Sequence, residues 1–351
     1  MSTIDCHKEM KGFHAAEVTL PKPEQDEMRG RRNAGRTRLK SGLAAAKHAA
    51  PKDIASQGSY AMRTMVQDDD SDYDIDDGAY FEKEDLKKSD GSYLSAPEAR
   101  QRVRNALKDD RLAYDAVVKE NCVRQKYPEG YHIDIPVYRI VRTEDAFGSE
   151  SMYYELASGD DWVKQDARAV TSWYNNAIGQ ELKSGESDTS QTRRVTKLTK
   201  KLARSRGAWK AKTTTGICIS KLVIDYMACV TDRDDDAVRK TWEAIKARLD
   251  LSVRISHPVD QSKNLAEEGD EDVSFFRDCL GGALKKLEVL DKLACTKHNA
   301  LDAWDGVFNT TYFSAQIDAD VAKSLLKPAA AAAGLSFPSR PVVPNKSSGF
   351  A

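Results

Sequence analysis

Two kinds of hydrophobic spacing divide the chain. In its first half, short runs alternate between apolar and polar residues, which is typical of half-buried strands. Ser71–Tyr80 and the β-branched run His132–Val141 are the clearest of these runs. Between them, Ala96–Glu120 is predicted to be a helix, since Ser95 can cap it and Pro97 suits its first turn. These signals predict a region that mixes strands and helices.

From Asp166 onward the apolar residues recur with a period of 3.6, which predicts helices. An earlier stretch, Glu24–Lys47, is rich in Arg, Ala, Leu and Lys and is predicted to be one long polar helix. Polar loops are expected at Gly185–Gln191 and at residues 261–272. The helices predicted after Asp166 are Ala167–Leu182, Arg193–Arg206, Ile217–Val230, Asp236–Leu249 and Val273–Phe308.

The change of pattern predicts two lobes and a tail. The first lobe, with an N-terminal helix, takes residues 1–165, and a helical lobe takes residues 166–327. Residues 328–351 are rich in Pro, Ala and Ser and are predicted to be a flexible tail. A chain of 351 residues is long enough for two packed lobes. A ligand site is expected in the cleft between them.

Composition limits the partners. The net charge is -1 and the pI is about 6.6, so no long nucleic acid is expected as a ligand. No apolar run approaches the roughly 20 residues of a membrane helix, and the polar start predicts a cytoplasmic protein without membrane contact. The cysteines are scattered and are predicted to be free thiols. The spacing of Cys279, Cys295 and His298 fits no zinc pattern.

An acidic segment carries the candidate chemistry. Seven of the ten residues from Asp68 to Asp77 are Asp, and such crowding is costly unless water or cations neutralise it. Alternation places Asp72, Asp74 and Asp76 on one face of a strand, where two carboxylates can hold a pair of Mg²⁺ ions about 4 Å apart. Asp134, in the middle of the later strand, is the candidate third ligand.

A Gly-Ser turn precedes the acidic strand. Gly58 lets the backbone approach a phosphate and Ser59 offers a hydroxyl, although no P-loop motif is present. An acidic run alone is more often a solvated loop. A calcium loop starting at Asp72 fails, because its sixth and twelfth positions are Asp77 and Lys83. The combination of turn, paired aspartates and later aspartate is the more specific signal.

These motifs resemble those of a known family. QGS, DIDDGAYF and HIDIPVY are similar to the signature of the bacterial cGAS/DncV-like nucleotidyltransferases (CD-NTases) of the polymerase β superfamily. The resemblance continues through ELASGDDWVKQDARAVTSWYN, RRVTKLTKKL, TTTGICISKLVIDYM and NALDAWDGVFN. It implies an α+β fold, in which a polymerase β-like lobe with a mixed sheet is followed by a helical C-terminal lobe.

The resemblance also implies an activity. Such an enzyme makes a cyclic di- or trinucleotide second messenger from ATP, with or without another nucleoside triphosphate, in CBASS antiphage defence. Two Mg²⁺ ions, which Mn²⁺ could replace, assist the reaction. The residues assigned to metal binding and catalysis are Asp74, Asp76 and Asp134, with Asp72 as the alternative to Asp76. Those assigned to nucleotide binding are Gln57, Gly58, Ser59, Lys200 and Thr215.

Several alternatives stay open. The enzyme could instead extend an RNA end linearly, or the fold could be an inactive nucleotide-binding module. The basic segment that contains Lys200 could be a solvated helix face rather than a polyphosphate site. The threonines at 213–215 could cap a helix or contact a base. His132 is expected to pack beside the site.

The resemblance suggests partners as well. The terminus Gly349-Phe350-Ala351 is similar to those that a ubiquitin-transfer-like enzyme conjugates in some CBASS systems. A HORMA-type regulator is the other expected partner. An effector is expected to receive the nucleotide product rather than the protein itself.

Overall fold

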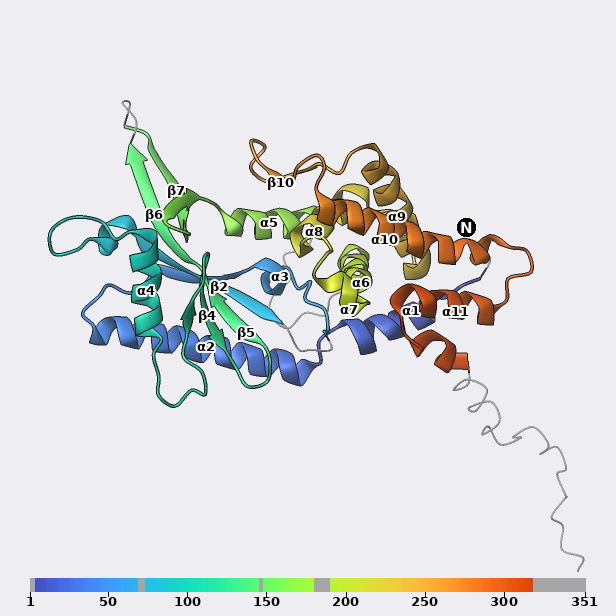
Figure 1. Ribbon diagram of the computed structural model, residues 1–351, viewed down its shortest axis with the longest axis horizontal. Helices are drawn as coiled ribbons and strands as arrows, with labels where there is room; N and C mark the ends of the chain where they lie inside the picture. The colour runs from blue at the N-terminus through green and yellow to red at the C-terminus, as the bar shows by residue number, and fades with distance from the viewer. Residues whose placement is uncertain (1–3, 69–72, 145–147, 180–189, 318–351) are drawn as a thin grey trace, which may run out of the picture.

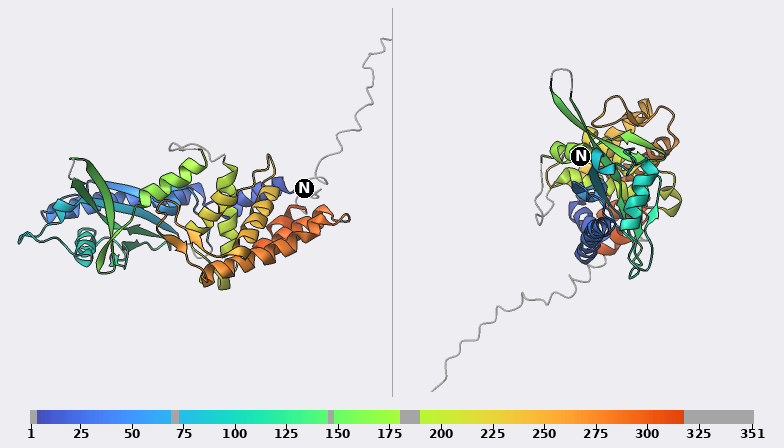
Figure 2. Two further views of the ribbon diagram at one scale, coloured as in Figure 1. Left: turned by 90° about the horizontal axis from the view of Figure 1, so that it is seen from above. Right: turned by 90° about the vertical axis from the view of Figure 1, so that its left-hand side faces the viewer.

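The structure is a computed structural model that describes residues 4–68, 73–144, 148–179 and 190–317. A mixed sheet lies at one end and a group of helices at the other, and the left-hand view in Figure 2, seen from above, keeps this elongated arrangement. The predicted α+β class is confirmed. The strands of the main sheet are β1 Asp53–Gln57, β2 Asp74–Glu82, β3 Val117–Val118, β4 Val123–Lys126, β5 His132–Ile135, β6 Val137–Glu144, β7 Glu150–Ser158 and β8 Asp161–Lys164.

Helices cover this sheet and build the second lobe. They are α1 His7–Phe13, α2 Lys22–Ala45, α3 Gly58–Ala61, α4 Ala96–Ala106, α5 Ala167–Ala177, α6 Gln191–Arg204, α7 Gly207–Lys210, α8 Gly216–Tyr226, α9 Asp234–Leu251, α10 Glu271–Leu287 and α11 Lys297–Phe308. A small hairpin, β9 Ile255–Ser256 with β10 Asn264–Ala266, lies between α9 and α10. No helix in the described ranges has the length and apolarity to cross a bilayer.

Strand β2 organises the sheet. It pairs antiparallel with β1 on one edge and parallel with β5 and then β6 on the other. The run His132–Val141, predicted to be one strand, is interrupted at Pro136, which has no N–H to donate. The two parts keep the same register against β2, and the Pro136 carbonyl accepts from Ala79 N–H at 2.8 Å. The interruption therefore leaves the strand's course unchanged.

The alternation predicted for β2 is confirmed over its described residues. Tyr73, Ile75, Ala79 and Phe81 are buried in a core beneath α2 and α4. These apolar residues fix which face points inward, because a slip of one residue would expose all of them. The aspartates at even positions therefore point to the other face.

The first helix belongs to the second lobe. Met10, Phe13 and Val18 are buried among the side chains of α6, α8, α9 and α11. The range 1–165 predicted for the first lobe thus contains residues of both cores. Figure 1 shows the dark-blue α1 beside α11, while α2 continues along the sheet.

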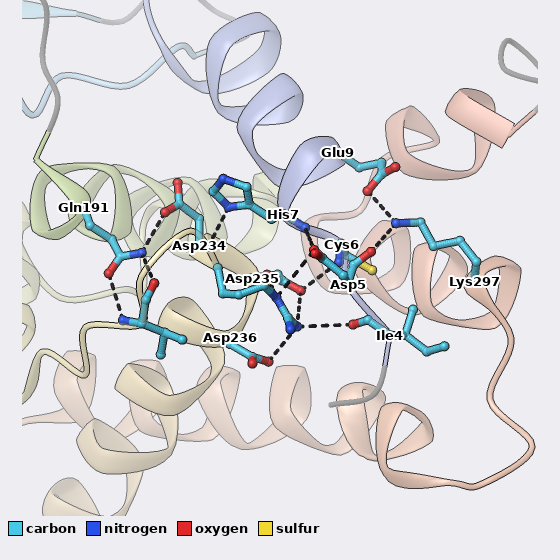
Figure 3. A network of polar contacts seen from close by, with 12 residues as sticks. Ile4, Asp5, Cys6, His7, Glu9, Gln191, Asp234, Asp235, Asp236 and Lys297 are labelled. Carbon is cyan, nitrogen blue, oxygen red and sulfur yellow. Dashed lines mark hydrogen bonds and ion pairs between the residues drawn. The ribbon is translucent and has the colours of Figure 1, made fainter. Parts of the chain in front are cut away.

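Polar contacts tie the start of the chain to α9 and α11 (Figure 3). The Asp234 N–H donates to His7 Nδ1 at 2.9 Å, and the Cys6 N–H donates to the Asp235 carboxylate at 2.9 Å. Lys297 binds the Glu9 carboxylate at 2.6 Å. These contacts join residues more than 200 positions apart, which no local sequence pattern could predict.

Two helices end at other residues than the sequence predicted. The helix expected over Ala96–Glu120 begins with the predicted Ser95 capping box but ends at Ala106. There the Asp109 side chain accepts from the Arg111 N–H at 3.2 Å, which favours a turn.

The segment Val273–Phe308, predicted to be one helix, is α10 and α11 with a short 3₁₀ helix, Glu288–Asp291, after α10. Thr296 and Asn299 form a capping box that starts α11. The predicted loop at 261–272 also contains β10 and the first residues of α10.

Candidate active site

Three carboxylates converge on the outer face of β2 and β5. In the parallel register, Asp74 lies beside His132 and Asp76 lies beside Asp134. All four side chains therefore share one face of the sheet. The structure brings together the three aspartates predicted to bind metal. Asp72 lies outside the described residues.

Burial and mutual repulsion act on Asp76. Its pKa is raised to about 8, first by burial and then by the charges of Asp74 and Asp134. At neutral pH, ionising Asp76 is therefore unfavourable unless cations are present. A site of crowded oxygen donors at the edge of a cavity suits a hard divalent cation such as Mg²⁺.

The third carboxylate differs from the other two. Both oxygens of Asp134 accept from Arg124, at 2.8 Å from Nε and 2.7 Å from Nη2. His132 Nε2 lies 3.8 Å from the same carboxylate. Asp74 and Asp76 thus have carboxylate oxygens available for a metal ion, whereas both oxygens of Asp134 are bound to Arg124. Among the described residues, no three His, Cys, Asp or Glu side chains are already grouped around a metal-sized site.

Other aspartates of the acidic run have structural roles. Asp77 points to the core side of β2 and binds Arg36 of α2, with 2.7 Å between Nε and Oδ2. Asp68 binds Lys210 of α7 at 2.9 Å. The crowding noted in the sequence is therefore divided between the two faces of the strand and the second lobe.

The Gly-Ser turn lies against the carboxylates. Gly58 follows β1 and has φ +64°, a conformation that favours glycine. A Cβ atom at this position would lie 2.2 Å from Asp76 Oδ2. The absence of a side chain is thus required for both the backbone conformation and the space of the carboxylate.

Replacing Gly58 by Ala should therefore damage the site. We expect a loss of about 1–3 kcal/mol in the free energy of unfolding from backbone strain, with displacement of the Asp76 carboxylate. Chemical denaturation measures the first effect. Gly30→Ala in α2 is the matched control, since a Cβ at Gly30 would have no neighbour within 4 Å and alanine there should add about 0.5–1 kcal/mol. A Gly58→Ala protein as stable as the wild type would contradict this account of the turn.

A first cavity of about 510 Å³ opens beside the carboxylates. Its walls come from both lobes, as expected for a ligand cleft. The first lobe provides the Gly-Ser turn and two aspartates, and the second provides α6 and the start of α8. The polar lining residues include Gly58, Ser59, Asp74, Asp76, Lys200, Arg204, Lys210, Thr214 and Thr215.

Lys200 is a buried cation on the wall of this cavity. Only 7% of it is exposed, and its Nζ donates to Thr64 Oγ1 at 2.8 Å. Burial, with the nearby charge of Arg204, lowers the pKa of Lys200 to about 7. Lys197 is buried too, so the alternative of a fully solvated basic face is wrong for this helix.

Thr215 has a structural contact as well as a place on the wall. Its hydroxyl caps α8 by accepting from the Cys218 N–H at 3.5 Å. Capping, one of the two roles considered for these threonines, is thus present in the structure. The same residue lines the first cavity beside Gly216.

Gln57 supports the turn through its side chain. Its amide donates to Tyr138 Oη and accepts from Tyr80 Oη, both at 3.1 Å. The two tyrosine rings stack 4.5 Å apart. Because both ends of the amide are engaged by tyrosines, Gln57 holds the end of β1 in place. Gln57 also lines the second cavity, and its contact with a nucleotide stays a prediction.

A second cavity, of about 1200 Å³, lies on the other side of the carboxylates. Its walls include Asp76, Asp134, Tyr138 and Tyr154 from the sheet, and the loop between β9 and β10 closes it. Lys263 of that loop donates to the Lys164 carbonyl at 2.8 Å, which joins the two lobes. No sequence pattern indicated this cavity, because its walls come from segments that are far apart in the sequence. Four residues line both cavities: Gly58, Met62, Asp76 and Ile217.

The geometry matches a known domain. Residues 52–138, which contain the turn and the three aspartates, match the family model of the cyclic GMP-AMP synthase DncV-like nucleotidyltransferase domain. The chain carries a DncV-like nucleotidyltransferase domain. Over 90% of its length the chain shares its fold with solved CD-NTase structures, so the predicted polymerase β-like lobe with a helical second lobe is confirmed.

Three solved structures with a similar fold show how far the similarity extends. The Vibrio cholerae di-nucleotide cyclase DncV, in complex with GTP and 5MTHFGLU2, has a TM-score of 0.67 at 17% identity, covering 90% of this chain and 99% of that one. Bradyrhizobium diazoefficiens CdnG with GTP gives 0.66 at 16%, covering 90% and 100%. Escherichia coli MS115-1 CdnC in a complex with HORMA-deltaN gives 0.62 at 17%, covering 88% and 98%.

Proposed function

We propose that this nucleotidyltransferase makes a cyclic di- or trinucleotide from ATP, with or without another nucleoside triphosphate. The observation that carries the proposal is the position of Asp76 and Gly58 on the walls of both cavities. Two nucleotides bound in the two cavities would meet at the same carboxylate, Asp76. The fold shared with a di-nucleotide cyclase supports the same conclusion.

The residues of the first cavity suit a donor triphosphate. Gly58 and Ser59 present backbone and hydroxyl groups to phosphates, and Lys200, which lines the same cavity, offsets their charge. Asp74 and Asp76, with Asp134 once released from Arg124, would hold two Mg²⁺ ions. When bound, such ions activate an attacking hydroxyl and stabilise a pyrophosphate leaving group. Mn²⁺ has similar ligand preferences and could replace them.

The second cavity suits the nucleotide whose ribose hydroxyl attacks. Its half-buried aromatic residues Tyr153 and Tyr154 offer apolar surface to a base, and Asp76 and Asp134 line the same cavity. Ring closure requires the linear product to be repositioned, so that its own triphosphate enters the first cavity. The volume of about 1200 Å³ leaves room for that movement.

The two alternatives are less well supported. A linear enzyme acting on an RNA end would need a surface that attracts a long polyanion, and the net charge of -1 does not provide a global attraction. An inactive binding module would not need three carboxylates crowded on one face at the cost that the raised Asp76 pKa indicates.

We also propose that the product acts in CBASS antiphage defence in the cytoplasm, through an effector that binds the nucleotide. The complex of the related CdnC with a HORMA protein supports a regulator of that class here. Conjugation of Ala351 by a ubiquitin-transfer-like enzyme is the other proposed route of regulation. The tail that carries Ala351 lies outside the described residues.

Labelled nucleotides test the activity. The purified protein is incubated with labelled ATP, GTP, CTP and UTP plus Mg²⁺, and the products are treated with phosphatase. We expect products that resist phosphatase and require ATP. Products that lose a terminal phosphate would identify a linear enzyme, and the absence of product with every nucleotide and metal would favour an inactive module.

A further inference from the structure

The ion pair between Arg124 and Asp134 lies inside the candidate metal site. β4 and β5 are antiparallel, and Arg124 is directly opposite Asp134 in their register. The guanidinium binds both carboxylate oxygens, at 2.8 and 2.7 Å. The Asp134 side chain is 8% exposed and that of Arg124 is 30% exposed, so the pair extends from the buried face toward solvent.

This arrangement competes with metal binding. A carboxylate that already accepts two hydrogen bonds from a guanidinium has fewer lone pairs for a cation, and the positive charge repels one. Asp74 and Asp76 have no such guanidinium contact within the described part of the chain. All three aspartates are therefore present at the site, but Asp134 is not available as a metal ligand while Arg124 binds it.

We propose that Arg124 is a positioning residue that keeps Asp134 from the metals until a nucleotide phosphate binds its guanidinium. This inference rests on the proposed function. Phosphate is the other anion that the planar guanidinium binds with two parallel hydrogen bonds. Cys122, two residues before Arg124, and Asp134, directly opposite it, line the second cavity, so a phosphate in that cavity would lie next to the ion pair. Nucleotide binding and completion of the metal site are thus coupled.

The coupling predicts opposite effects for the two partners of the ion pair. Without Arg124, Asp134 is free and metal ions bind more tightly to the nucleotide-free protein. Without the Asp134 charge, Arg124 is free and a nucleotide phosphate binds more tightly in the absence of metal. A residue that only stabilised the sheet would produce neither effect.

Metal affinity is the first measurement. Mn²⁺ binding to the nucleotide-free protein is followed by the electron paramagnetic resonance signal of free Mn²⁺. We expect Arg124→Met to lower the dissociation constant about tenfold, the size of effect typical of a charge-assisted hydrogen bond. Arg124→Lys, which keeps the charge but loses the two-pronged contact, should lie between the two proteins. Arg139→Met is the matched control, since Arg139 pairs with Glu155 on the neighbouring strands and lines neither cavity.

Nucleotide affinity without metal is the second measurement. ATP binding is measured by calorimetry in EDTA. Asp134→Asn should bind ATP several-fold more tightly than Asp76→Asn does, although both variants replace one carboxyl group by an amide on the same face. Circular dichroism confirms that each variant is folded before its binding is compared.

The outcomes separate this inference from the proposed function. If Arg124→Met binds Mn²⁺ no more tightly than the wild type while Asp74→Asn with Asp76→Asn abolishes Mn²⁺ binding, the metal site stands and the role of Arg124 is wrong. If Asp134→Asn gains no more affinity for ATP than Asp76→Asn, phosphate does not take over the guanidinium. If no variant binds Mn²⁺ at all, both the metal-dependent mechanism and the inference fail.

Discussion

Replacing Asp74 and Asp76 together by Asn should reduce the rate of product formation at least about 1000-fold. Metal ions stabilise several kcal/mol of developing charge in phosphoryl transfer, and each 1.36 kcal/mol is a factor of ten in rate. The two residues are the carboxylates of β2 that face both lobes, and neither supports the core beneath the sheet. The rate is measured with labelled ATP under saturating Mg²⁺.

The same variant should not lose stability. In the metal-free protein the pKa of Asp76 is about 8, well above the ordinary value of 3.8. Between about pH 4 and pH 8 the folded state therefore holds a proton that the unfolded state releases, so this group makes stability fall as the pH rises through that window. Asn removes this contribution. The melting temperature near pH 8 should be equal to or higher than that of the wild type.

Asp77→Asn is the contrasting control. It lies one residue further along β2, on the core side, where Arg36 binds it. Loss of the Asp77 charge should lower the melting temperature, because the Arg36 guanidinium is left without its carboxylate partner. The protein that remains folded should still make product at a measurable rate. Retained synthesis in the Asp74 and Asp76 double variant would instead move the site to Asp72 or exclude the metal mechanism.

Lys200→Ala should raise the Michaelis constant for the donor triphosphate about 10- to 100-fold. A charge-assisted contact is worth about 1.5–3 kcal/mol, and each 1.4 kcal/mol corresponds to a factor of ten in affinity. The buried amino group lines the same cavity as the Gly-Ser turn, with no carboxylate bound to it among the described residues. Initial rates over a range of ATP concentrations measure the effect.

Folding should change little in this variant. Burying the ammonium is costly, as the lowered pKa of Lys200 indicates, and this cost offsets the packing of its four-carbon stem. Lys201→Ala is the matched control, since Lys201 is the next residue of α6 and lines neither cavity. Equal Michaelis constants for the Lys200 and Lys201 variants would show that the amine does not meet the triphosphate.

Local pattern was enough to predict which face of β2 carries the candidate aspartates, while the choice of Asp74 and Asp76 over Asp72 came from the resemblance to a family. The alternation around Ile75 fixed the face on which Asp74 and Asp76 lie, because the apolar residues of β2 had to reach a core. Asp134 was predicted because a carboxylate in the middle of an apolar strand needs a partner. The interruption at Pro136 was not predicted, although proline commonly breaks a strand ladder.

Contacts between residues far apart in the chain could not be predicted from the sequence pattern. Arg124 meets Asp134 only because β4 and β5 pair in one register. The residues of β4, Val123–Lys126, show no pattern that predicts a strand. The packing of α1 with the second lobe depends on contacts with α9 and α11, far along the chain. The second cavity depends on a loop from the helical lobe reaching Lys164. Such features arise from how elements assemble rather than from the periodicity within them.

A crystal structure with a nonhydrolysable ATP analogue and Mn²⁺ tests the central claim most directly. Anomalous scattering locates Mn²⁺ without reference to the protein. The account predicts Mn²⁺ between Asp74, Asp76 and Asp134, a triphosphate between Ser59 and Lys200, and Arg124 turned from Asp134 to a phosphate. A triphosphate bound away from the Gly-Ser turn, or Mn²⁺ absent from these carboxylates, would contradict it.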